Sequence, residues 1–133
     1  MQKVTLLLFI LCCLSCNKAS NEPDTVPVNL AIISTNTPRT ISQGQNIISN
    51  VRCSGSDLCY SFSHFEITNT DGKIFNISAK GNYPNSKKGD VICPQAIYYK
   101  DTTVSISTPS KGQYILKFYN NNQLSKSDTV QVN

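Results

Sequence analysis

The fold of this chain is decided by residues 112–132, GQYILKFYNNNQLSKSDTVQV. Large apolar side chains occupy every second position before a run of asparagines, at Tyr114, Leu116 and Phe118. This period of two is typical of a strand that buries one face. Asn120–Asn122 has turn-forming composition, and the alternation resumes at Val130 and Val132. The stretch therefore predicts two strands joined by a tight turn.

The same pattern extends back to Val28, as short alternating runs separated by turn residues, with no helical period of useful length. The other predicted strands lie around residues 28–32, 47–53, 59–68, 75–79 and 104–106. About seven short strands at regular spacing predict an all-β domain, a single antiparallel β-sandwich over residues 28–133. An up-and-down barrel is the alternative fold.

The aromatic strand around residues 59–68 has a change of parity. Tyr60 and Phe62 share one parity, and Phe65 and Ile67 share the other, so a bulge near Ser63 would let all four side chains face inward. A hairpin turn is predicted at residues 69–72, where the sequence is NTDG, and residues 81–90 are predicted to be a polar crossover.

The ending, with Gly112-x-Tyr114 opening the penultimate strand, resembles the last hairpin of immunoglobulin-like and fibronectin-III-like modules. The resemblance implies that the Tyr114 hydroxyl caps a neighbouring backbone turn. The chain departs from antibody domains because it has no Trp and no cysteine on the strand of Tyr114. The inter-sheet disulfide of those domains is therefore not expected.

The first sixteen residues have the features of a secretory targeting signal. Lys3 precedes the apolar run Val4–Leu14, which has the length of a secretory signal rather than of a spanning helix. The sequence Leu14-Ser15-Cys16 resembles the lipobox of bacterial lipoproteins, although Cys13 stands where Leu is usual. The resemblance implies a signal peptide over residues 1–15 and a lipidated Cys16. An ordinary signal peptide without lipid is the alternative.

Residues 16–27 are polar after the cysteine and predict a flexible tether. Membrane attachment would then come from lipid on Cys16. The pattern resembles Bacteroidota lipoproteins, in which acidic residues after the cysteine favour surface export; Glu22 and Asp24 are such residues. We expect an outer-membrane lipoprotein facing the periplasm or the cell surface. Asp24-Thr25-Val26 resembles the O-glycosylation motif of this group, with Thr25 as the candidate acceptor.

The net charge of +4 is low, and the basic residues are scattered apart from Lys87-Lys88. This distribution argues against a nucleic-acid partner.

Three cysteines follow the signal region, at Cys53, Cys59 and Cys93. In an oxidising compartment we expect one disulfide and one buried thiol, with all three pairings open. A metal site formed by these cysteines and His64 is disfavoured, because His64 lies roughly 16 Å along the strand from Cys59 at about 3.3 Å per residue.

His64 is the one histidine, and Glu66 has the same strand parity. A hydrolase could use His64 with Ser61 or Ser63 as nucleophile, yet no Gly-x-Ser-x-Gly turn presents either serine. We therefore expect no catalytic residue, cofactor or metal.

Tyr83, Tyr98 and Tyr99 are expected in loops or on outward faces, where tyrosines are typical of binding surfaces. The sequence thus favours a lipid-anchored, non-catalytic binding or assembly module whose partner is an envelope protein or a glycan. The alternatives are an inhibitor of a protease or lysozyme, presenting residues 81–89 as a loop, and the hydrolase based on His64.

Overall fold

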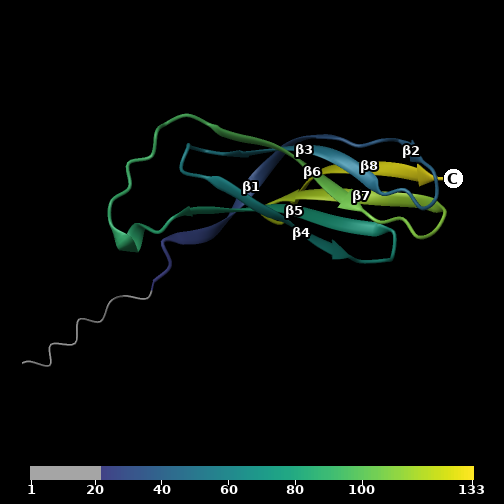
Figure 1. Ribbon diagram of the computed structural model, residues 1–133, viewed down its shortest axis with the longest axis horizontal. Coiled ribbons are helices and arrows are strands. Elements are labelled where there is room, and N and C mark those ends of the chain that lie inside the picture. Colours follow the sequence, from purple (N-terminus) through teal and green to yellow (C-terminus); the bar gives the residue numbers. More distant parts are fainter. Residues whose placement is uncertain (1–21) are drawn as a thin grey trace, which may run out of the picture.

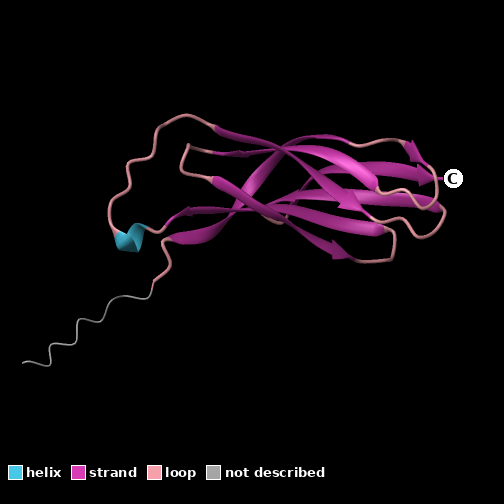
Figure 2. Ribbon diagram, viewed as in Figure 1, coloured by secondary structure: helices cyan, strands magenta, loops and turns pink. Residues whose placement is uncertain are grey.

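The computed structural model describes residues 22–133 and contains eight strands and one short 3-10 helix. Figures 1 and 2 show an elongated, almost entirely β molecule whose C-terminus lies at the end opposite the helix. The strands are β1 (Thr25–Asn36), β2 (Thr40–Ile41), β3 (Ile47–Gly55), β4 (Ser61–Asn69), β5 (Ile74–Pro84), β6 (Tyr98–Ile106), β7 (Gly112–Asn120) and β8 (Gln123–Val132), and the helix is η1 (Ser86–Lys88). Within residues 22–133 no helix has the length and apolar character needed to cross a membrane.

The strands form a continuous sheet that curls into two layers. One layer has the order β2-β8-β7-β5-β4 and the other has the order β1-β3-β6, with β1 belonging to both. The β2–β8 and β5–β7 pairs are parallel, and all other pairs are antiparallel. The predicted β-sandwich is confirmed, with eight strands rather than about seven. The first strand begins at Thr25, inside the segment predicted as the tether.

β1 joins the layers because its two halves pair with different strands. Thr25 to Leu30 pair with β5, and Ala31 to Asn36 pair with β3, with a bulge between Ile32 and Ser34. At this transition the side chain of Asn120 accepts a hydrogen bond from the Ile32 N–H and donates one to the Ile32 carbonyl. The Asn120 amide thereby replaces a strand partner at the point where β1 changes sheets.

The core lies between the layers and is built from alternate strand residues. Its buried apolar members are Leu30, Ile32, Ile47, Val51, Cys53, Ile77, Ala79, Val104, Ile106, Tyr114, Leu116, Phe118, Val130 and Val132. The side chains predicted to be buried in the last hairpin are all fully buried. The Tyr114 hydroxyl donates to the Ser110 carbonyl at 3.0 Å and accepts from the Ser110 N–H, which confirms that this tyrosine caps a turn.

The aromatic strand follows its prediction at Phe62 and Phe65, but the prediction that Ile67 faces inward is wrong, because Ile67 lies near the end of the edge strand β4 and is 40% exposed. The register of β4 on β5 shifts between Phe62 and His64, so the predicted bulge near Ser63 is present. The rings of Phe62 and Phe65 consequently both lie against the core, in an edge-to-face contact with centroids 5.1 Å apart. The following hairpin turns through Gly72, whose φ of 62° is one that glycine adopts without strain.

The prediction that the crossover starts at Gly81 is wrong, because β5 continues to Pro84 and pairs there with β1. A Cβ atom at Gly81 would collide with the Ser61 carbonyl oxygen and lie in tight contact with the Leu30 side chain. Gly81 therefore permits close strand packing rather than a turn, a role that its local sequence does not distinguish. The observed connection runs over residues 85–97.

Candidate functional site

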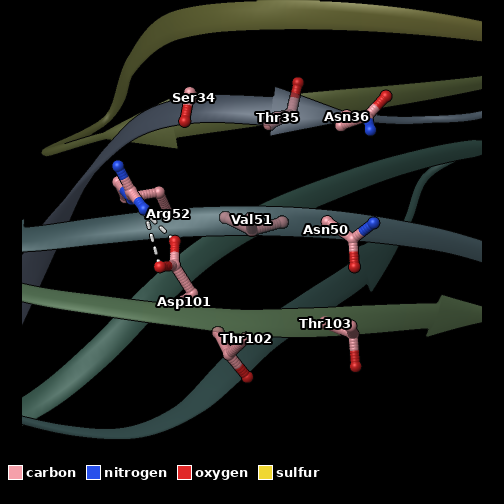
Figure 3. Close-up of a pocket in the computed structure, with 9 residues that line it drawn as sticks. All are labelled: Ser34, Thr35, Asn36, Asn50, Val51, Arg52, Asp101, Thr102 and Thr103. Atoms are coloured by element: carbon pink, nitrogen blue, oxygen red, sulfur yellow. Dashed lines mark hydrogen bonds and ion pairs between the residues drawn. The ribbon is translucent and has the colours of Figure 1, made fainter.

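An open groove of about 590 Å³ runs across β1, β3 and β6 (Figure 3). We call it the outer groove, and it is lined by Ser34, Thr35, Asn36, Asn50, Val51, Arg52, Asp101, Thr102 and Thr103. The strand register aligns its outward side chains in two rows, Ser34-Arg52-Asp101 and Asn36-Asn50-Thr103. Inward neighbours such as Val51 are buried, whereas the row residues are exposed. Alternation therefore places hydroxyls, amides and one ion pair on the same face.

The ion pair is bidentate. Arg52 Nε and a terminal guanidinium nitrogen each donate to an oxygen of Asp101 at 2.7 Å. The Arg52 hydrogen bond holds the pKa of the Asp101 carboxyl below its ordinary value, and the same contact raises the pKa of Arg52. Both side chains stay more than half exposed, so the pair adds little stability. The pair holds the guanidinium and the carboxylate in a defined arrangement, and their two charges cancel.

A tyrosine flanks the outer groove. Tyr99 pairs with Ser54, one outward row beyond Arg52 and Asp101, and its side chain is 56% exposed. Of the three tyrosines predicted to form a binding surface, Tyr99 is the most open. The Tyr98 hydroxyl accepts from the Phe62 N–H at 3.0 Å, and Tyr83 packs on Tyr60 with ring centroids 4.7 Å apart. Tyr83 and Tyr98 are therefore partly committed to internal contacts.

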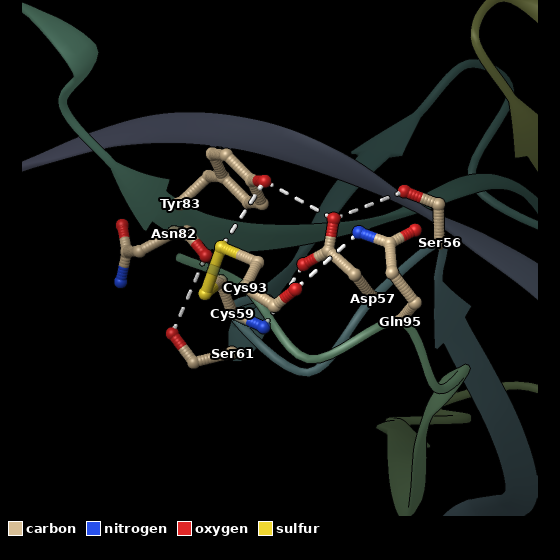
Figure 4. Close-up of a disulfide and its surroundings, with 8 residues drawn as sticks. All are labelled: Ser56, Asp57, Cys59, Ser61, Asn82, Tyr83, Cys93 and Gln95. Atoms are coloured by element: carbon tan, nitrogen blue, oxygen red, sulfur yellow. Dashed lines mark hydrogen bonds between the residues drawn. A yellow bond between two sulfur atoms is a disulfide. The ribbon is translucent and has the colours of Figure 1, made fainter. Parts of the chain in front are cut away.

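The second polar cluster surrounds a disulfide between Cys59 and Cys93 (Figure 4). It ties the β3–β4 loop to the connection between β5 and β6. Asp57, which is buried, accepts from the Cys59 N–H at 2.9 Å and from the Tyr83 hydroxyl at 3.0 Å. That hydrogen bond, with some burial, raises the pKa of Tyr83 above its ordinary value. The prediction of one disulfide is confirmed, and the structure selects one of the three open pairings.

The remaining thiol, Cys53, is fully buried in the core. Burial, assisted by the negative charge of Asp101, raises the pKa of Cys53 to about 11. Because the thiolate is the reactive form, Cys53 is inert in the folded protein at neutral pH. The predicted buried thiol is thus confirmed.

One group of side chains has metal-ligand chemistry within the described residues: Asp57, Cys59 and Cys93, whose ligand atoms lie within 4.8 Å of one another. The two sulfurs are bonded to each other, and a disulfide sulfur offers no thiolate to a metal ion. The oxidised cluster is therefore a covalent link rather than a metal centre.

His64 lies on the exposed face of β4 and lines a groove of about 370 Å³. Its Nδ1 is 3.0 Å from the Ser63 hydroxyl, but Glu66 contacts Lys80 at 2.9 Å. The hydrogen bond from Lys80 lowers the pKa of Glu66. Glu66 is thus engaged by a cation and does not orient the imidazole as a hydrolase would require. Ser61 is on the same strand, and its hydroxyl contacts the Asn82 carbonyl.

Cys16, the predicted lipidation site, lies outside the described residues. Thr25, the candidate glycosylation acceptor, is exposed at the start of β1. The inhibitor loop predicted over residues 81–89 is shorter than expected, since its first four residues belong to β5.

Sequence reasoning missed the outer groove, including Arg52, Asp101 and Asn50. Alternation marks each of them as outward-facing, because Val51 and Val104 fix the inward parity. That signal does not reveal that β3 and β6 are neighbours, and so it cannot pair Arg52 with Asp101.

In comparisons with known proteins, the family model described as "ORF11 beta-sandwich domain" matches residues 49–132. No curated protein and no solved structure matches the chain.

Proposed function

The chain belongs to the ORF11 β-sandwich domain family, and on this premise we propose that it is a lipid-anchored, non-catalytic binding module of a Bacteroidota-type envelope. In this proposal Cys16 carries the lipid, the domain stands on the outer membrane, and the outer groove binds a neutral glycan. The observation that carries the proposal is the outer groove itself, an exposed polar face with a fixed ion pair.

The chemistry of the groove favours a glycan over a charged partner. Apart from Arg52 and Asp101, its outward side chains carry amides and hydroxyls, which both donate and accept hydrogen bonds, as sugar hydroxyls do. Arg52 and Asp101 neutralise each other, so neither attracts an ion of opposite charge over long range. Tyr99 adds a large rigid surface with a polar tip beside them. A protein partner would be favoured by a contiguous apolar patch, which the row residues do not form.

The position of the described N-terminus supports the anchor. Glu22 and Asp24 contact Lys87 and Lys88 of η1, which lies at one end of the long axis (Figure 1). The outer groove lies on the side of the sandwich, between this end and the C-terminus. A lipid on Cys16 would therefore hold the domain by one end and leave the groove free.

The test measures binding of the processed full chain, in non-ionic detergent, to a panel of neutral oligosaccharides of glucose, mannose and N-acetylglucosamine. Arg52→Ala should weaken binding at least about tenfold, because a hydrogen bond from a charged group contributes about 1.5–3 kcal/mol. Lys111→Ala is the matched control, since it removes the same charge at an exposed turn away from the groove. Equal affinities of Arg52→Ala and wild type, or no binding to any member of the panel, would contradict the glycan proposal.

The anchor is tested separately. Mass spectrometry of the mature N-terminus should find acylated Cys16, and Cys16→Ser should release the protein from the membrane fraction. An unmodified N-terminus in the wild type would refute the anchor.

A further inference from the structure

The end of the molecule that contains η1 has several exposed apolar side chains. We call it the tether pole and define it as the β3–β4 loop, residues 56–60, and the β5–β6 connection, residues 85–97. Ile92 is 94% exposed, and Val91, Ile97 and Leu58 are each at least half exposed. Soluble proteins expose single apolar residues commonly, but a cluster at one tip marks a contact surface.

The segment that contains Val91 and Ile92, which we call the Val91–Ile92 tip, is flanked by a disulfide and by hydrogen bonds. The Cys59–Cys93 disulfide joins the two loops one residue after Ile92, and the Leu58 N–H donates to the Pro94 carbonyl at 3.2 Å. On the other side, the Asn85 side chain accepts from the Lys87 N–H at the start of η1. These links fix the chain on both sides of Val91 and Ile92, whose side chains are exposed.

The described chain begins at the same pole. The Asn85 N–H donates to the Asp24 carbonyl at 2.9 Å, and Asn85 Nδ2 donates to the Pro23 carbonyl. Residues 16–21 lie outside the described part, and so short a segment can span at most about 20 Å even when fully extended. A lipid on Cys16 would therefore bring the bilayer surface within that distance of Glu22, where the described chain begins at the tether pole.

Charge at the pole points to apolar rather than electrostatic contact. Lys88 pairs with Asp24 at 2.7 Å, and Lys87 pairs with Glu22 at 3.5 Å. The Lys88 contact lowers the pKa of Asp24, so this pair stays ionised at neutral pH. Because both lysines are compensated, the pole has no free basic pair with which to select anionic headgroups.

We propose that the Val91–Ile92 tip inserts into the headgroup region of the bilayer that holds the lipid anchor. The inference rests on the lipid anchor proposed above. This contact orients the long axis of the sandwich away from the membrane, with the tether pole at the bilayer. The outer groove, on the side of the sandwich, then opens to the solvent above the membrane surface. Acylation supplies the attachment, and the tip supplies the orientation.

The sequence provides a clean probe, because it contains no Trp. The experiment places Ile92→Trp in the processed full chain, reconstituted in phosphatidylcholine vesicles. The control is Ile48→Trp, since Ile48 is 47% exposed and pairs with Ser105, at the far end of β3 from the tether pole. Both substitutions are on exposed side chains, and far-UV circular dichroism checks that both variants fold.

For Ile92→Trp we expect emission at shorter wavelength in vesicles than in water, and quenching by brominated lipids. For Ile48→Trp we expect emission typical of water and quenching by aqueous acrylamide alone. If the vesicles retain Ile92→Trp but its emission matches the control, the tip does not insert and the anchor stands. If neither variant floats with the vesicles, the anchor fails and the inference fails with it.

Discussion

Removal of the disulfide is the perturbation whose effect the structure best quantifies. Cys59 and Cys93 are separated by 34 residues, and closing a loop of that length lowers the entropy of the unfolded chain. In the chain-entropy model this corresponds to about 4 kcal/mol at 25 °C. For a domain of this size, a change of 1 kcal/mol moves the melting temperature by about 4 °C, so the double variant Cys59→Ser/Cys93→Ser should melt about 15 °C lower.

The assay is thermal unfolding of the full chain in non-ionic detergent, followed by far-UV circular dichroism. A reductant should lower the melting temperature of the wild type to that of the double variant, and should leave the double variant unchanged because Cys53 is already a free thiol. Peptide mapping of the oxidised wild type should recover Cys59 linked to Cys93. A double variant that melts within about 3 °C of the oxidised wild type would refute the reasoning, since it would show that the disulfide does not stabilise the protein by lowering the entropy of the unfolded chain.

Three further predictions concern the core. Tyr114→Phe removes the hydrogen bonds to Ser110 and should lower the free energy of unfolding in urea by about 1–2 kcal/mol. An unchanged midpoint of urea unfolding would show that these hydrogen bonds contribute nothing to stability. Burial raises the pKa of Cys53 from its ordinary 9.0 to about 11 in the folded protein. The protonated Cys53 thiol therefore stabilises the folded state fully below pH 9, and this stabilisation is lost between pH 9 and pH 11. A pH series of urea midpoints should show a loss of about 2–3 kcal/mol across that window, and Cys53→Ala should abolish it; an equal slope in both proteins would contradict the assignment. Gly81→Ala places a methyl against the Ser61 carbonyl and should cost about 1–3 kcal/mol by the same assay, whereas a neutral effect would show that the strands can separate there without loss.

Local patterns carry most of the fold in this chain. The alternation at Tyr114, Leu116 and Phe118 determines which face is buried, because neighbouring strand residues point to opposite sides whatever the partner. The parity change around Ser63 predicts the bulge for the same reason. The role of the Tyr114 hydroxyl is implied by the resemblance of Gly112-x-Tyr114 to the last hairpin of immunoglobulin-like modules, and the turn that it caps is only four residues away.

The groove and the disulfide depend on contacts between distant segments, and local sequence does not encode them. Arg52 meets Asp101 only because β3 and β6 are adjacent, and Cys93 meets Cys59 because the β5–β6 connection crosses to the β3–β4 loop. Strand order results from the packing of the whole core, in which many small apolar contacts are summed. The amino-acid sequence by itself determined most of the strands and most of their buried faces. Only the tertiary structure decided which strands are neighbours, which cysteines pair and where a ligand could bind, because those outcomes depend on the free energy of the complete sandwich.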